Sequence, residues 1–218
     1  MGWASDRPFC FLTVHHFILT PYSSLSFIFQ KFLLFLLYIY IYFLKSLITF
    51  LIMTNLYLDL EWFTNQKLFL IGYAYSIKDF GQLYENTLTV DHLEQVFKPA
   101  DGYVFFYGPD IAMLEKFFDI NIRDHCPCVN LIRVFKKALP GRRSYKLSEL
   151  EKTYGINRST VEYKTNIFKL WHDWNDLRLR KLILKYNMED VLNLIRLKKY
   201  IFNDCSVTRN DLNELLLS

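Results

Sequence analysis

Two acidic residues in one short apolar stretch are the first residues here that could do chemistry. The stretch Leu56-Tyr57-Leu58-Asp59-Leu60-Glu61-Trp62 alternates as a β-strand does, so Asp59 and Glu61 would emerge on the same face. Carboxylates that share a buried face repel each other, and one takes up a proton unless a cation neutralises them. This pattern therefore predicts a metal site on a strand, against the alternative of an edge strand with a solvated acidic face.

A third carboxylate, Asp110, follows an aromatic and β-branched run at 103–107 that is suited to a buried strand. The turn Tyr107-Gly108-Pro109-Asp110 leads into an amphipathic pattern at 111–118, with Pro109 well placed for a first helical turn. Asp110 is therefore expected at the end of the strand and close to a helix N-terminus. It could be a ligand at the same sheet edge, or it could only favour the helix dipole.

Tyr186 and Asp190 lie in a helical pattern over 175–202. Because they are four residues apart, both side chains should lie on one face of the helix, one turn apart. The alternative is a Tyr in the core and an Asp on the surface.

The elements that must position these residues alternate between strand and helix. Strands are predicted over 56–62, 67–76, 82–88 and 103–107, and helices over 90–97, 111–118, 129–138, 146–154 and 175–202. Hairpin strands followed by a helix and another strand indicate a mixed α/β sheet. Beyond Asn203 we expect a small capping turn or a frayed end.

Basic and aromatic residues are interleaved between positions 142 and 158. The set comprises Arg142, Arg143, Tyr145, Lys146, Lys152, Tyr154 and Arg158. Such a mixture can follow a phosphate backbone and stack bases, and we take Arg142, Arg143 and Lys146 as candidate nucleic-acid-binding residues. It can equally be a solvated surface.

Composition sets the outer bounds. With 218 residues, 22% of them charged and 52% hydrophobic, the chain can bury one good core and an accessory segment. A net charge of +4 excludes a polybasic tail, so any nucleic-acid contact must come from a local groove. The four cysteines form no CxxC pair and no convincing export signal precedes them, so we expect reduced thiols in a cytoplasmic protein. His125-Cys126-Pro127-Cys128 could be half of a zinc site, but no second half follows.

Residues 1–52 are of a different kind. From Phe32 to Leu44 every residue is apolar or Tyr, and the run resumes after Lys45-Ser46. Its length suits a membrane anchor through residues 32–52.

Two observations favour another interpretation, in which residues 1–52 are translated upstream sequence and Met53 is the true start. The predicted strand begins about three residues after Ile52, which leaves almost no linker. Between Pro8 and Met53, Val14 is the only residue of the five types whose codons begin with G.

Asp59-x-Glu61, Asp110 and Tyr186-x-x-x-Asp190 follow the order of the DEDD exonuclease motifs. The chain therefore resembles the ribonuclease H-like superfamily, and within it the DEDDy branch that Tyr-x-x-x-Asp marks. The phrase from Leu184 to Val191, with Ser144-Tyr145-Lys146-Leu147 upstream, is most similar to the YprB-like ribonuclease H-like domain family. The resemblance covers about residues 56–202. It does not extend to the hydrophobic segment at 1–52, and we expect a nuclease domain at 53–203 and a tail at 204–218.

The resemblance implies a mixed sheet of about five strands flanked by helices, with the first strand central. Asp59, Glu61, Asp110 and Asp190 would bind two Mg²⁺ or Mn²⁺ ions, and Glu61 and Tyr186 would orient the attacking water.

The implied activity is 3′-5′ exonucleolytic hydrolysis of single-stranded DNA or RNA. Many relatives have a longer turn before the third carboxylate, and Asp101 is the nearest substitute if Asp110 is misplaced. There are two alternatives to the nuclease interpretation. One is a non-catalytic nucleic-acid-binding domain or processing subunit, and the other is a membrane-anchored protein whose soluble domain is incidental.

Overall fold

The computed structural model describes residues 22–63, 67–159, 163 and 167–216. The chain divides into two compact units, residues 1–52 and residues 53–218. We describe each unit by itself.

The first unit contains the helix α1 (Tyr22–Ile52), whose side chains are described at 29–44. These side chains are exposed and almost all apolar or Tyr. Positions 45–52, where the sequence continues the apolar run, are helical, but their side chains lie outside the described residues. In the described part of the chain, no helix combines the length and the apolar character that crossing a membrane requires.

The second unit is built on a mixed five-stranded sheet, as predicted. The strands are β1 (Leu56–Trp62), β2 (Leu68–Ser76), β3 (Asp79–Tyr84), β4 (Val104–Phe106) and β5 (Cys128–Asn130), in the spatial order β3-β2-β1-β4-β5. The first three strands are antiparallel neighbours, whereas β4 runs parallel to β1 and β5 runs parallel to β4. The strand that carries the first two carboxylates is thus the central one.

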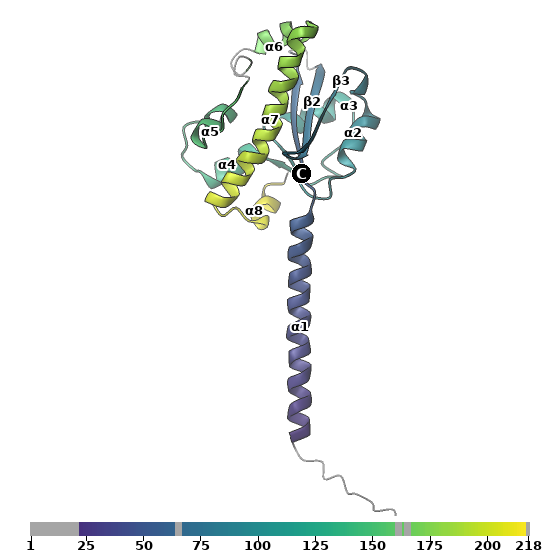
Figure 1. Cartoon of the computed structure of the whole chain (residues 1–218), viewed down its shortest axis with the longest axis vertical. Coiled ribbons are helices and arrows are strands. Elements are labelled where there is room, and N and C mark those ends of the chain that lie inside the picture. The colour runs from purple at the N-terminus through teal and green to yellow at the C-terminus, as the bar shows by residue number, and fades with distance from the viewer. Residues whose placement is uncertain (1–21, 64–66, 160–162, 164–166, 217–218) are drawn as a thin grey trace, which may run out of the picture. The chain divides into compact units, whose positions relative to one another are not determined.

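Helices flank this sheet. They are α2 (Val90–Phe97), α3 (Asp110–Phe118), α4 (Leu131–Ala138), α5 (Leu147–Thr153), α6 (Ile167–Trp174), α7 (Leu177–Asp204) and α8 (Arg209–Glu214). Figure 1 shows the long helix α7 crossing in front of the strands. Polar side chains at Thr89, Asn130 and Asp176 cap the N-termini of α2, α4 and α7 by accepting hydrogen bonds from backbone N–H groups, as helix N-caps commonly do.

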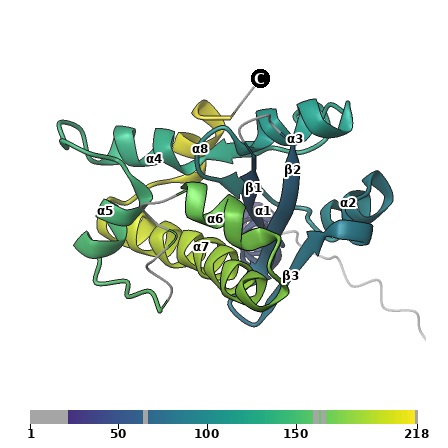
Figure 2. The ribbon, with the colours of Figure 1, turned by 90° about the horizontal axis from the view of Figure 1, so that it is seen from above.

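The alternation of β1 sorts its side chains between two cores. Leu56, Leu58 and Leu60 pack into the core shared with α2 and α3, while Tyr57 packs into the core shared with α4 and α7. Figure 2 shows α7 and α2 on opposite sides of β1 and β2. Because Asp59 and Glu61 alternate with the leucines, they project on the same side as Tyr57, toward α7.

Gly72 lets α7 approach the sheet closely. This glycine pairs with Asp59 across β1 and β2. A Cβ atom at this position would lie 2.3 Å from Asn187 Oδ1 and 2.8 Å from Val191 Cγ2, so any larger residue would push α7 away. The absence of a side chain at Gly72 therefore sets how near α7 lies to the acidic strand.

Some elements differ from the sequence prediction. The third strand covers Asp79–Tyr84 rather than 82–88, because Glu85 adopts a positive φ of 50° and begins a short 3-10 helix, η1 (Glu85–Thr87). The helix predicted over 129–138 begins only at Leu131, since the chain before it pairs with β4 as β5. The helix α6 was not predicted.

Beyond Asn203, where a small capping turn or a frayed end was expected, the chain forms a short helix. This helix is α8, and its Leu212 is buried in the core. Nearby, the hydroxyl of Tyr103 donates to Asn213 Oδ1 at 2.8 Å. This tail packs against the sheet and closes its β5 side through a bridge between Val129 and Leu216.

Candidate active site

Three carboxylates from two elements meet beside the central strand. Asp59 and Glu61 come from β1 and Asp190 from α7, and one oxygen atom of each lies within 4.8 Å of the others. In the described part of the chain, no other group of three or more His, Cys, Asp or Glu side chains is placed to hold a metal ion. Asp59 and Glu61 lie on one face of the strand, as their alternation predicted. Asp190 lies on the face of α7 that is turned toward them.

Asp110 lies close to this group without joining it. It is the first residue of α3, which begins after β4, and it is buried. The preceding turn is fixed by Gly108, whose φ of 106° suits glycine, and by Asn130, whose Nδ2 donates to the Gly108 carbonyl at 2.7 Å. The Oδ2 atom of Asp110 is buried without a hydrogen-bond partner among the described residues.

The electrostatics of the two β1 carboxylates reflect burial and crowding. Burial first, and then the negative charges of Asp190 and Asp110, raise the pKa values of Asp59 and Glu61 well above their ordinary range. The pKa of Asp110 is also raised well above its usual value, chiefly by burial, although a backbone hydrogen bond from Tyr107 opposes the shift. Such a cluster binds protons tightly until a cation takes their place.

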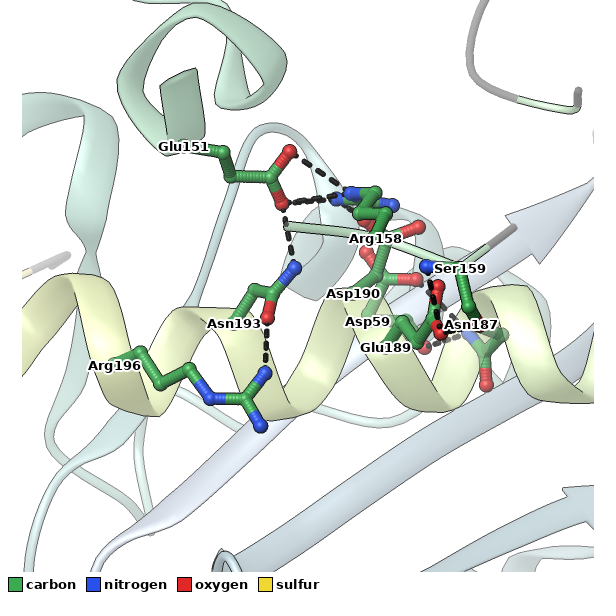
Figure 3. A network of polar contacts seen from close by, with 9 residues as sticks. All are labelled: Asp59, Glu151, Arg158, Ser159, Asn187, Glu189, Asp190, Asn193 and Arg196. Carbon is green, nitrogen blue, oxygen red and sulfur yellow. Dashed lines mark hydrogen bonds and ion pairs between the residues drawn. The ribbon is translucent and has the colours of Figure 1, made fainter. Parts of the chain in front are cut away.

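Asp190 differs because an arginine pairs with it. Burial raises its pKa, whereas the charge and the hydrogen bond of Arg158 lower it. Figure 3 shows Arg158 between Asp190 on α7 and Glu151 on α5, in ion-pair contact with both. The guanidinium of Arg158 thus supplies one resident positive charge to the acidic centre.

Asn187 fixes Asp59 from the facing helix. Its Nδ2 donates to Asp59 Oδ2 at 2.9 Å, and its Oδ1 accepts a hydrogen bond of 2.9 Å from Gln82 Nε2 on β3. Asn187 is fully buried, so these bonds hold α7 and β1 in register where the carboxylates converge.

Tyr186 lies at the edge of the same centre. Its ring lies under the guanidinium of Arg158, 5.3 Å from the guanidinium carbon to the ring centroid. Burial first, and then the charges of Asp190, Glu61 and Asp59, raise the pKa of its hydroxyl far above the ordinary value near 10. The hydroxyl is therefore protonated at neutral pH and can donate a hydrogen bond.

The candidate nucleic-acid-binding residues lie on the α4–α5 connection and the start of α5. The Arg142 guanidinium donates from Nε to the Ser144 carbonyl at 2.8 Å and also to the Glu149 carbonyl at 3.1 Å, so it braces its own loop. Arg143 and Lys146 are exposed.

Asp101, the substitute considered for Asp110, accepts a hydrogen bond from the Thr54 backbone N–H at 2.6 Å. Thr54 precedes β1, so Asp101 lies at the opposite end of that strand from Glu61. The stretch His125-Cys126-Pro127-Cys128 forms no metal group within the described residues. Cys126, Cys128 and Cys205 are free thiols, and Cys128 is buried in β5, whereas Cys10 lies outside the described residues.

Sequence reasoning missed three residues that shape this centre. Glu151 and Asn187 were not singled out, and Arg158 was counted among surface cations. Asn187 had one available signal, since it lies three residues before Asp190 and so shares its helical face. No sequence signal marked Glu151 or Arg158, because each of them is buried by contacts with residues that are distant in the sequence.

The residues present fit a hard divalent cation. The donor set of Asp59, Glu61 and Asp190 consists of carboxylate oxygens, which Mg²⁺ and Mn²⁺ prefer. The raised pKa values of Asp59 and Glu61 show that their negative charges are not fully balanced by protein cations. The Oδ2 atom of Asp110 can also accept a hydrogen bond that no described residue supplies.

Fold and site together define an α/β domain with an acidic, oxygen-rich centre on its central strand. A model of the RNase H superfamily matches residues 56–202, and the chain belongs to this superfamily. A search of curated proteins gives no match. Membership of the superfamily implies a nucleic-acid substrate and suggests nuclease activity, and nucleases of this kind usually use divalent metals.

Proposed function

We propose that this protein is a DEDDy-type nuclease related to the YprB-like family, which hydrolyses phosphodiester bonds from the 3′ end of single-stranded DNA or RNA. The observation that carries the proposal is the convergence of Asp59, Glu61 and Asp190, one oxygen of each within 4.8 Å of the others, beside the central strand of an RNase H-like sheet. The nuclease domain would span residues 53–203, and the tail 204–218, whose helix α8 packs against the sheet, would complete its core. The hydrophobic segment 1–52 would be a separate unit.

Asp59, Glu61, Asp110 and Asp190 would hold two Mg²⁺ or Mn²⁺ ions. When bound, such ions lower the pKa of water and stabilise negative charge on a phosphodiester. The role of the carboxylates is to remain ionised and close together, and Arg158 supports this by lowering the pKa of Asp59, Glu61 and Asp190.

Glu61 and Tyr186 would orient the attacking water. The Tyr186 hydroxyl donates a hydrogen bond to the water oxygen, while Glu61 accepts one from a water proton, so the oxygen points at phosphorus. In the reaction, a bond forms between the water oxygen and phosphorus, and the bond from phosphorus to the leaving 3′ oxygen breaks. The water proton that faces Glu61 passes through that carboxylate to solvent, and the leaving oxygen takes a proton from solvent to become a hydroxyl.

Arg143 and Lys146 would contact the phosphate backbone of the bound strand, since both are exposed and cationic. Arg142 would act with them mainly by holding the loop. A cytoplasmic location is part of the same proposal and is supported by the free thiols of Cys126, Cys128 and Cys205.

The test is cleavage of end-labelled single-stranded DNA and RNA by the purified full-length protein with Mg²⁺, Mn²⁺ or EDTA. We expect a metal-dependent ladder of products that shorten from the 3′ end. Binding without cleavage in every metal would identify a non-catalytic nucleic-acid-binding domain instead, and products from internal cuts would identify an endonuclease.

A further inference from the structure

One arginine is buried inside the acidic centre. The side chain of Arg158 is 3% exposed, and its ion-pair partners Glu151 and Asp190 are 1% and 4% exposed. Its Nε atom donates to both carboxylate oxygens of Glu151 at 2.8 Å, and its Nη2 atom donates to Glu151 and Asp190. Arginines are rarely buried unless they are paired in this way.

The guanidinium is held in place by a chain of side chains. Asn193 Nδ2 donates to Glu151 Oε1 at 2.8 Å, and Arg196 Nη1 donates to Asn193 Oδ1 at 2.5 Å. Figure 3 shows this chain running along α7 to Arg158. Glu151 and Asn193 are fully buried, so Arg158 is fixed from both α5 and α7 before any ligand arrives.

A purely structural role leaves part of the guanidinium unused. Pairing with Glu151 and Asp190 takes Nε and Nη2, whereas Nη1 is buried and has no hydrogen-bond partner within the described residues. A buried donor without an acceptor is costly, which points to an acceptor that arrives with a ligand.

The surroundings define the chemistry of that acceptor. The acceptor must reach the Arg158 guanidinium, which contacts Asp190 and the Tyr186 ring. A ligand atom in that position lies as close to the carboxylates as the phosphate group that reacts. A planar guanidinium with a permanent charge binds phosphate oxygens well. The non-bridging oxygens of a phosphodiester match both requirements.

We propose that Arg158 is a catalytic residue whose Nη1 group donates to a non-bridging oxygen of the phosphodiester that is cleaved. Its charge stabilises the negative charge that builds on that oxygen as water attacks. Glu151 is the positioning residue that holds it. This inference rests on the nuclease function proposed above.

The decisive variant is the double substitution Glu151→Gln with Arg158→Gln. It removes both charges of the Arg158–Glu151 pair together, so Glu151 is not left as a buried charge without its partner, while Asp190 remains for the metal. The matched control is Glu151→Gln alone, which keeps the cation. The measurements are kcat on a single-stranded oligonucleotide, the Kd for Mn²⁺ by calorimetry, and the melting temperature of each full-length protein.

We expect the double variant to lose a factor on the order of 10²–10³ in kcat, as when one charged donor is removed from a transition-state site. It should still bind Mn²⁺, because Asp59, Glu61 and Asp190 are all retained. The control keeps the cation but holds it less firmly, so its kcat should fall by a clearly smaller factor than that of the double variant. Arg158→Lys, which keeps the charge but not the planar fork, should also lower kcat with normal Mn²⁺ binding.

Three results would overturn the inference. Wild-type kcat in the double variant or in Arg158→Lys would make Arg158 structural, while the proposed nuclease function would stand. Parallel loss of Mn²⁺ binding and cleavage would show that Arg158 only orients Asp190. Absence of metal-dependent cleavage by the wild-type protein would instead remove the proposed function, and the catalytic role of Arg158 with it.

Discussion

Replacing Gly72 by Ala should damage the acidic centre without touching a carboxylate. The added Cβ would lie 2.3 Å from Asn187 Oδ1 and 2.8 Å from Val191 Cγ2. Both atoms belong to buried side chains of α7, and Asn187 is held by hydrogen bonds to Gln82 and Asp59, so neither can swing aside. The helix must therefore shift away from the sheet.

The cost can be worked from these contacts. Overpacking a tight interior costs roughly 1–3 kcal/mol, and weakening the hydrogen bond from Asn187 to Asp59 adds about 1 kcal/mol. Replacing a strand glycine by alanine returns about 0.5–1 kcal/mol. The net loss of roughly 1–3 kcal/mol should lower the Tm by about 3–10 °C for a folded unit of this size.

Thermal unfolding followed by circular dichroism measures the change, and calorimetry with Mn²⁺ should show weaker binding because Asp190 moves with α7. The matched control is Gly81→Ala on β3, where the Cβ would meet the outer end of the Tyr73 ring, 2.3 Å from its hydroxyl. That ring is only partly buried and can rotate. A Tm for Gly72→Ala equal to that of Gly81→Ala or of the wild type would refute the packing argument.

Two further predictions concern the ionisation of the site. Because the pKa values of Asp59, Glu61, Asp110 and Asp190 are raised in the folded state, the metal-free protein should lose stability as the pH rises above about 4, where carboxyl groups titrate in the unfolded chain. In EDTA the Tm should fall over this range, and Asp59→Asn should reduce the fall. A Tm in EDTA that rises over this range would contradict the shifts. Tyr186→Phe should lower kcat about 10- to 100-fold, the cost of one lost hydrogen bond to a reacting group, with unchanged Mn²⁺ affinity. Since the raised pKa keeps this hydroxyl protonated, the pH at half-maximal kcat should be the same in wild type and variant, and a shift would show that Tyr186 titrates.

Helices and strands in which apolar and polar residues recur with a clear period were predictable from the sequence. The first strand and the helix over Val90–Phe97 have the predicted bounds, because alternation and a polar N-terminus mark them locally. The strand β5 was not predicted, since three residues carry no period and pair only because β4 is beside them. The helix α6 was missed in an aromatic segment whose packing depends on Phe69 and Ile183 from elsewhere in the chain.

The candidate site divides in the same way. The positions of Asp59, Glu61 and Asp190 followed from strand and helix periodicity together with the order of motifs. The buried state of Arg158 did not, because it lies after Gly155 in a polar stretch and is covered only where α5 and α7 meet. Likewise, Asn187 is oriented by Gln82 from a strand 105 residues away, which no local pattern can indicate.

The most direct test of the central claim is single-turnover cleavage of a 5′-labelled oligonucleotide by the wild-type protein and by Asp59→Asn and Asp190→Asn, each with excess Mn²⁺. The substitutions keep side-chain shape and remove one negative charge from the acidic centre. We predict that both variants keep the far-ultraviolet circular dichroism spectrum of the wild type and lose cleavage. Undiminished cleavage by both variants would contradict the account, because the activity would then arise elsewhere.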